Sequence, residues 1–149
     1  SLFTSMNSKK EMIAQMLVGT KDEEYTVGVL GTEEGDILSS ISLRRDLDNN
    51  GMTVFAEVVD NELIKDYSEK IVSLLKPRGY CNVQLRLHNG RPYAFEINGR
   101  ISSSTGFRTT AGFNEPEIIL RHYFLKQNIK PEPIKKVEMV RINNEILLS

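Results

Sequence analysis

The segment YAFEINGRISSST, residues 93–105, brings three polar side chains of different chemistry close together. Glu96, Asn98 and Arg100 occupy alternate positions, and apolar residues take the other parity of the strand. Alternate residues of an extended strand point to one face, so a carboxylate, an amide and a guanidinium would share that face. Carboxylate and amide oxygens suit Mg²⁺, and a guanidinium suits a phosphate group. The segment therefore predicts a site for a metal ion and a phosphate.

The strand before this segment supplies a third oxygen ligand if the hairpin has the appropriate register. A three-residue loop over 89–91 would place Gln84 opposite Glu96, whereas a two-residue loop over 89–90 would place Gln84 opposite Phe95. The longer loop also pairs apolar residues, which favours it: Leu87 with Tyr93, Leu85 with Phe95 and Val83 with Ile97. We therefore predict that Gln84, Glu96 and Asn98 lie together as ligands of one Mg²⁺ ion.

An ordinary antiparallel strand with one solvated face gives the same alternation, and Glu96 opposite Gln84 would then be a solvated pair. Two features favour the metal site. Asn98 and Gly99 are poor strand residues, and a long loop rich in Gly, Ser and Thr follows over 99–112, as is common at functional sites. On the pattern alone, both interpretations stay open.

The remaining sequence predicts an α+β domain, with a mostly antiparallel sheet and two main helices packed on it. Asp60 is a candidate N-cap for the first helix, which Pro77 and Gly79 end, and Asn114 is a candidate N-cap for the second. The predicted strands cover 24–30, 37–45, 52–59, 80–88 and 91–98, and the predicted helices cover 61–76 and 115–127. Residues 8–17 fit a short helix or, over 15–18, the end of a strand; a connector and a terminal hairpin are expected over 127–149.

Composition narrows the possible functions. The chain has 149 residues, a formal net charge of −1 and 40% hydrophobic residues, which fits one domain with a core. Balanced charge gives no overall attraction to nucleic acid or to an anionic membrane. Cys81 is the only cysteine, which excludes an internal disulfide and favours a reducing compartment. With no long apolar run, we expect a cytoplasmic protein, and the start at Ser1 without Met suggests a fragment.

Two longer stretches carry a family resemblance. GYCNVQLRL and YAFEINGRISSSTGFRTTAGFNEPEIIL together resemble the C-terminal half of an ATP-grasp domain. They are most similar to the carbamoyl-phosphate synthase large subunit and related ATP-grasp ligases. Upstream, AQMLVGTKDEEYTVGVL resembles the family segment that contacts adenine and ribose. The resemblance covers a core of about 15–126 and implies the C-terminal lobe of the ATP-grasp fold.

The resemblance also implies roles for the residues. Gln84, Glu96 and Asn98 would bind Mg²⁺ (or Mn²⁺) that bridges the phosphates of ATP, with Gln84 and Glu96 also facing the nucleotide. Arg100 would contact a phosphate or an acyl-phosphate intermediate as the catalytic residue.

The adenine and ribose contacts are implied further upstream. Backbone groups around Gln15 and Leu17 would meet adenine, and Glu24 would accept a ribose hydroxyl. Core packing of Leu17 and a solvated Glu24 are the alternatives.

The chain departs from the family pattern in two ways. Ser103 stands where carbamoyl-phosphate synthases have a second arginine, and Arg108 is either a substitute for that charge or a surface arginine. An N-terminal lobe with its phosphate-binding lysine is missing, since Lys9, Lys10 and Lys21 fit solvated charges. The resemblance implies a ligase that activates a small carboxylate or bicarbonate with ATP, inactive as an isolated chain. The alternatives are a non-catalytic nucleotide- or metal-binding module or split subunit that needs a separate N-terminal lobe, and an interaction domain.

Overall fold

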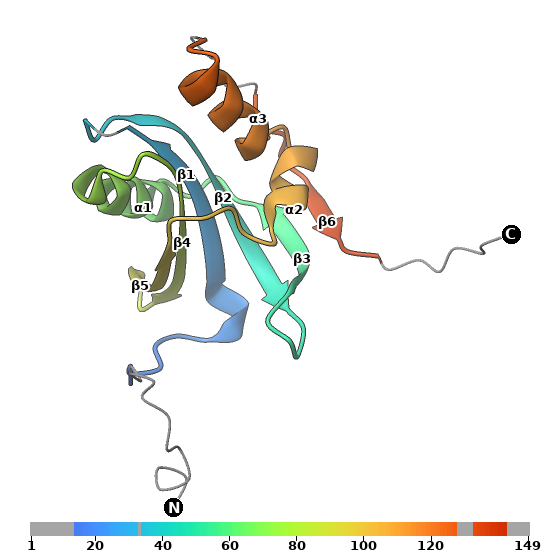
Figure 1. Ribbon diagram of the computed structural model, residues 1–149. Coiled ribbons are helices and arrows are strands. Elements are labelled where there is room, and N and C mark those ends of the chain that lie inside the picture. Colours follow the sequence, from blue (N-terminus) through green and yellow to red (C-terminus); the bar gives the residue numbers. More distant parts are fainter. Residues whose placement is uncertain (1–13, 33, 128–132, 143–149) are drawn as a thin grey trace, which may run out of the picture.

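One antiparallel sheet, built from all six strands of the described residues, forms the centre of the protein (Figure 1). The structure is a computed structural model that describes residues 14–32, 34–127 and 133–142. The strand order is β5-β4-β1-β2-β3-β6, and the predicted α+β class is confirmed. The elements are η1 (Lys21–Glu23), β1 (Glu24–Gly31), β2 (Ile37–Leu47), β3 (Thr53–Val58), α1 (Glu62–Leu75), β4 (Gly79–His88), β5 (Arg91–Asn98), α2 (Thr105–Thr110), α3 (Glu115–Ile119), η2 (Leu120–Phe124) and β6 (Glu138–Val140).

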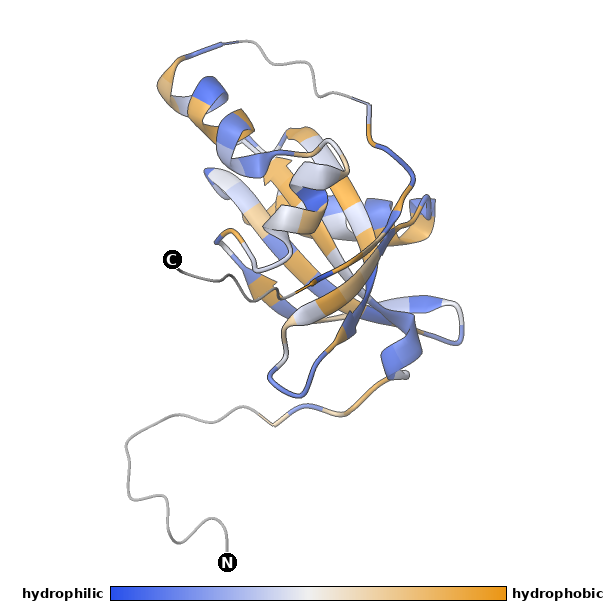
Figure 2. Ribbon diagram, turned by 90° about the vertical axis from the view of Figure 1, so that its right-hand side faces the viewer, coloured by the Kyte–Doolittle hydropathy of each residue, from blue (hydrophilic) through white to orange (hydrophobic). Residues whose placement is uncertain are grey.

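Helices cover both faces of the sheet, with α1 on one side and α2 on the other (Figure 1). Between them, the hydrophobic colours of Figure 2 gather on the strands. Because both faces are covered, all eight residues of β1 are buried. The α1 face includes Val27, Val29, Ile64, Val72, Val83 and Leu85, and the α2 face includes Leu30, Ile41, Leu43, Ala56, Phe107 and Phe113.

Both helix starts depend on an asparagine cap. Asn61 accepts a hydrogen bond from the Ile64 N–H at 3.3 Å, so the N-cap of α1 lies one residue after the predicted cap, Asp60, and the helix begins at Glu62. Asp60 instead accepts a hydrogen bond from Lys136. Asn114 caps α3 as predicted, accepting from the backbone N–H of Glu117.

The hairpin between β4 and β5 has a shorter turn than predicted but keeps the predicted central pair. Asn89 and Gly90 both have positive φ, 51° and 72°, which is the two-residue type I′ turn favoured by Asn-Gly. His88 therefore pairs with Arg91, and the predicted three-residue loop is wrong. A β-bulge at Phe95 then adds one residue to β5, so Gln84 still lies opposite Glu96 and Asn82 opposite Asn98.

Three other expectations concern the loop and the ends of the chain. The loop 99–112 contains the short helix α2. The strand β6 pairs with β3, and the second strand predicted for the terminal hairpin, residues 145–149, lies outside the described residues. Residues 14–18 form no regular element. The other part of the predicted segment, residues 8–13, lies outside the described residues. Among the helices described, none combines the length and the apolar character needed to cross a membrane.

Candidate functional site: a polar face on the sheet

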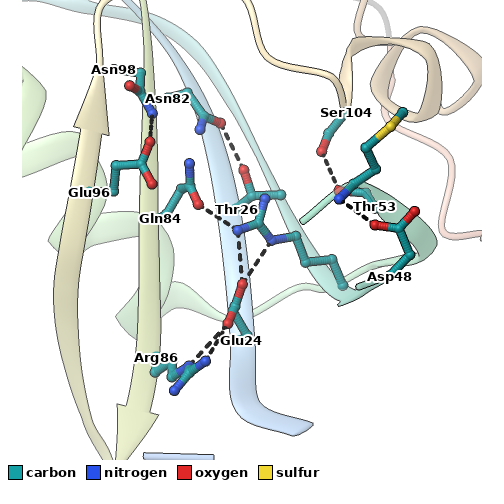
Figure 3. Close-up of polar contacts among 12 residues, drawn as sticks. Glu24, Thr26, Asp48, Thr53, Asn82, Gln84, Arg86, Glu96, Asn98 and Ser104 are labelled. Carbon is teal, nitrogen blue, oxygen red and sulfur yellow. Dashed lines mark hydrogen bonds and ion pairs between the residues drawn. The ribbon is translucent and has the colours of Figure 1, made fainter. Parts of the chain in front are cut away.

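The face of the sheet toward α2 carries a continuous row of polar side chains (Figure 3). They come from four neighbouring strands, because one parity of each strand points to α1 and the other to this face. We call this set the polar face: Glu24 and Thr26 on β1, Arg45 on β2, Asn82, Gln84 and Arg86 on β4, and Glu96 and Asn98 on β5.

The three predicted metal ligands lie together on this face. Asn98 Nδ2 donates to Glu96 Oε1 at 2.7 Å, and Gln84 is the direct cross-strand partner of Glu96. Glu96 is exposed, whereas Gln84 and Asn98 are half-buried. The bulge at Phe95 produces this cluster, because without the added residue Glu96 would face α1.

Glu96 and Asn98 fit a small oxygen-binding cation such as Mg²⁺. Glu96 Oε2 and Asn98 Oδ1 accept no hydrogen bond from any described residue, so both oxygens can turn to a common ion. Gln84 Oε1 accepts from Arg45 Nη2 at 2.5 Å, so its oxygen is available only if that bond is exchanged. In the described part of the chain, no three His, Cys, Asp or Glu residues come together as a metal site. The fitting donors are therefore one carboxylate and its neighbouring amide.

Glu24 lies between two arginines and is buried, with 5% of its surface exposed. Its Oε1 accepts from Arg45 Nε at 3.2 Å and Nη2 at 2.8 Å. Its Oε2 accepts from Arg86 Nε at 3.0 Å and Nη2 at 2.8 Å. A carboxylate has about four acceptor positions, so a ribose hydroxyl could donate to Glu24 only by replacing a guanidinium N–H. The alternative of a solvated Glu24 is wrong.

Burial and charge act in opposite directions on Arg45. Burial lowers the pKa of the Arg45 guanidinium, the hydrogen bonds and charge of Glu24 raise it, and Arg108 nearby lowers it. Glu96 also raises this pKa, which indicates that Arg45 is close to the predicted metal ligands. Sequence reasoning missed Arg45 and Arg86; their only signal is that each has the strand parity of the polar face.

Arg100 lies beyond the end of β5 and is exposed. Its Nη1 donates weakly to the carbonyl of Ile101 at 3.4 Å, and its side chain bonds to none of the other predicted site residues. The segment that carries it is anchored just beyond, where Ser104 Oγ lies 2.9 Å from Thr53 Oγ1 (Figure 3). Arg100 therefore follows Asn98 in the chain but is not in contact with the polar face.

Gln15 and Leu17 line a cavity of about 430 Å³ at the β5 edge of the sheet. Arg86, Tyr93 and Phe95 form the facing wall. Gln15 Nε2 donates to the Phe95 carbonyl at 3.4 Å, and Leu17 is 82% exposed, so the alternative of core packing for Leu17 is wrong. The guanidinium carbon of Arg86 lies 5.8 Å from the centre of the Phe95 ring. The cavity has an apolar wall and cationic rim that suit a flat heteroaromatic group.

Arg108 is completely buried, so the expectation of a surface arginine is wrong. It reaches from α2 to the sheet, where Nη2 donates to Thr26 and Asn82 at 2.8 and 2.7 Å. Its Nη1 donates to Tyr80 and Ser102 and forms an ion pair of 3.1 Å with Glu115. We call these residues the Arg108 network.

The charge of Arg108 acts on the pKa values of two buried neighbours, and its guanidinium fills the space above β1. Burial raises the pKa of the Tyr80 phenol above its usual range, and it raises that of Glu115, which Arg108 opposes. The guanidinium crosses β1 above Gly28, where a Cβ atom would lie 3.0 Å from Arg108 Nε. With every N–H of its two terminal nitrogens directed into the protein, Arg108 does not replace the arginine missing at Ser103.

Solved structures show the same fold. The chain is similar to the phosphoribosylaminoimidazole carboxylase ATPase subunit from Aquifex aeolicus, with a TM-score of 0.66 and 17% identity over 81% of this chain and 40% of that one. It is also similar to N5-carboxyaminoimidazole ribonucleotide synthetase in an ADP complex, with a TM-score of 0.55 and 19% identity over 78% of this chain and 33% of that one. The chain thus spans well under half the length of these relatives.

The sequence comparison gives the family. Residues 8–145 match the family described as "ATP-grasp in the biosynthetic pathway with Ter operon". This match covers nearly the whole chain and agrees with the fold and with the ATP-grasp resemblance of the two strand motifs. The protein belongs to this family of ATP-grasp proteins.

Proposed function

We propose that this chain is the ATP- and Mg²⁺-binding C-terminal lobe of an ATP-grasp ligase. The observation that carries the proposal is the polar face, where Gln84, Glu96 and Asn98 meet beside guanidinium groups. The complete enzyme would activate a carboxylate: a carboxylate oxygen attacks the γ-phosphorus of ATP, the bond to the bridging oxygen breaks, and ADP leaves. An amine or similar nucleophile then attacks the acyl carbon, and phosphate leaves.

The chain's own residues would position and neutralise the reactants. Glu96 and Asn98 would hold the metal, joined by Gln84 after it exchanges its bond with Arg45. Bound Mg²⁺ would neutralise charge on the ATP phosphates. Arg100 would turn from the Ile101 carbonyl toward the transferred phosphoryl group and stabilise its charge. Positioning and charge are the main sources of catalysis in phosphoryl transfer.

The cavity at the β5 edge is our proposed adenine site. Backbone groups near Gln15 and Leu17 would meet the adenine edge, and Phe95 would supply apolar contact. Arg86 lines this cavity and also bonds Glu24, so it connects the adenine site to the carboxylate proposed to meet the ribose. Glu24 would accept a ribose hydroxyl in exchange for one of its guanidinium bonds.

The acceptor is proposed only as a class. Resemblance to carbamoyl-phosphate synthases favours a small carboxylate or bicarbonate, with the N-terminal lobe supplied by the remainder of a longer chain or by a separate protein. The covered share of the related chains, 33–40%, favours such a lobe. Ser103 argues against a bicarbonate site of the carbamoyl-phosphate synthase type, because the second arginine is missing.

The test uses the natural full-length protein and its N-terminal lobe. Glu96→Gln and Asn98→Ala should abolish acceptor-dependent ADP formation while the unfolding midpoint changes little, since both side chains lie at the sheet edge. Glu138→Gln on β6 is the matched control, because Glu138 is exposed and distant in the strand order. Normal turnover by a well-folded Glu96→Gln protein would refute the assignment of the site.

A second candidate function is a nucleotide-binding module without its own catalytic activity. The same observation favours it, since this chain holds the polar face but spans only part of its relatives. Metal-dependent ATP binding without turnover, even when an N-terminal lobe is present, would support this candidate over the ligase.

A further inference from the structure

Arg45 differs from the other buried arginine in one respect. It is 95% buried, with 5% of its surface exposed, yet it has a nitrogen that bonds to no described residue and is not sealed from solvent, whereas the unpartnered Nε of Arg108 is sealed. Nε and Nη2 donate to Glu24, and Nη2 also donates to Gln84. Nη1 bonds to no described residue, and it is not among the polar atoms sealed from solvent without a partner. Its N–H groups are therefore open to a ligand.

The surroundings of Arg45 fix the direction of its guanidinium. Glu24 holds one edge through two hydrogen bonds, and Arg86 holds Glu24 from the other side through two more. A guanidinium is planar, so this clamp orients the remaining nitrogen with little loss of side-chain entropy. Arg45 also lines a cavity of about 390 Å³ that gives a route from solvent; the other charged residues of its lining are Lys21, Arg86, Asp22, Glu24 and Asp46.

We propose that Arg45 is a phosphate-binding residue of the nucleotide site and that Glu24 acts as its positioning residue. This inference rests on the proposed function. Arg45 already contacts Gln84, one of the three predicted metal ligands, so an anion held near that metal lies within its reach. Arg45 supplies from β2 a second guanidinium in place of the arginine missing at Ser103. Arg108 cannot do so, because both of its terminal nitrogens are bonded within the Arg108 network.

Arg44 provides a matched control one residue away. It points to the other face of the sheet, where it pairs with Glu57 at 3.1 Å and Asp46 at 3.3 Å. The variants Arg45→Lys and Arg44→Lys make the same chemical change on opposite faces. Lysine keeps the charge next to Glu24 but replaces the planar fork of three guanidinium nitrogens with a single nitrogen. Arg45→Gln is a second variant in case Arg45→Lys is poorly folded.

The experiment measures dissociation constants of the full-length protein for ATP, inorganic tripolyphosphate and adenosine, with Mg²⁺ present. We expect Arg45→Lys to weaken the binding of ATP and of tripolyphosphate by about ten-fold or more, which is the effect of losing one charged hydrogen bond. Adenosine binding should not change, and Arg44→Lys should bind all three as the unmodified protein does.

The other outcomes separate the two proposals. ATP binding by Arg45→Lys that equals that of the unmodified protein would overturn the role of Arg45 and leave the proposed function standing. If Arg45→Lys weakened the binding of ATP and of adenosine equally, Arg45 would only support the fold, and the inference would also be overturned. An unmodified protein that binds neither ATP nor tripolyphosphate would overturn both the proposed function and this inference.

Discussion

Replacing Arg108 with methionine tests the Arg108 network directly. The substitution keeps most of the volume of the side chain but removes a guanidinium that bonds to five residues. Glu115 is also completely buried, and its second oxygen already has no hydrogen-bond partner. After the substitution, Glu115 would be a buried carboxylate without its cation.

The expected cost is large. Removing one partner of a buried ion pair costs about 3–5 kcal/mol, because the remaining charge is desolvated without compensation. The buried oxygens of Thr26 and Asn82 lose donors as well, which adds to this cost. Since domains are stable by only about 5–15 kcal/mol, the variant should unfold at a much lower urea concentration.

Urea denaturation gives the free energy of unfolding for each protein. Arg44→Met is the matched control, because the Arg44–Glu57 pair is partly exposed and such pairs contribute about 1 kcal/mol or less. Replacing Glu115 by methionine in the Arg108→Met protein should recover part of the loss, because the unpaired carboxylate is then absent.

The pH dependence supplies an independent check. Burial already raises the pKa of Glu115, and removing Arg108 removes the charge that opposes this rise. A folded pKa above the unfolded value stabilises at low pH and loses that effect as pH rises through the folded pKa. The loss in the free energy of unfolding caused by Arg108→Met should therefore be smaller near pH 5 than near pH 8. A cost below about 1 kcal/mol, or no recovery in the double variant, would refute this reasoning.

Three further outcomes follow from the packing. Gly28→Ala should destabilise the protein by about 1–3 kcal/mol, because the added Cβ would meet the guanidinium of Arg108. Gly106→Ala, whose Cβ would have no atom within 4 Å, should stabilise it by about 0.5–1 kcal/mol. Denaturation compares the free energies of unfolding of the two variants. Burial raises the pKa of the Cys81 thiol, so the stability that this thiol contributes should be present below about pH 8.5 and fall at higher pH. The free energy of unfolding of Cys81→Ala should fall less over the same pH range. Deleting Phe95 should remove the bulge and preserve the pairing of Gln84 with its partner, seen as an unchanged cross-strand proton contact by NMR; loss of that contact would contradict the register described here.

The β4–β5 hairpin shows how far sequence reasoning could reach. Matching apolar residues across the strands predicted the pairs Gln84–Glu96 and Val83–Ile97 correctly, although the turn is one residue shorter than predicted. The two apolar pairs nearer the turn were wrong, because Leu85 lies opposite Ala94 and Leu87 opposite Pro92. The bulge at Phe95 adds the missing residue, so two differences cancel. Asn89-Gly90 was a strong signal for the shorter turn, but nothing local in the sequence indicates where a compensating bulge lies.

The buried charges could not be predicted for a different reason. Arg45 and Arg86 are 21 and 62 residues from Glu24, and Arg108 is 82 residues from Thr26. The charge pattern of each segment alone fits a solvated surface, since isolated charges are seldom buried. Their burial depends on the order of strands in the sheet, which places partners from distant segments next to each other.

The position of β1 in the sheet also has a consequence for synthesis on the ribosome. Among the strands of the described residues, β1 is made first, yet it is a central strand that needs β2 on one edge and β4 on the other. Until residues 79–88 have been made, one edge of a strand that is entirely buried in the folded protein has no partner, which is a condition that favours aggregation. Thr26 also lacks its hydrogen-bond donor until Arg108 has been made. Nascent chains that stop before α2 should therefore depend on chaperones more than the finished protein does.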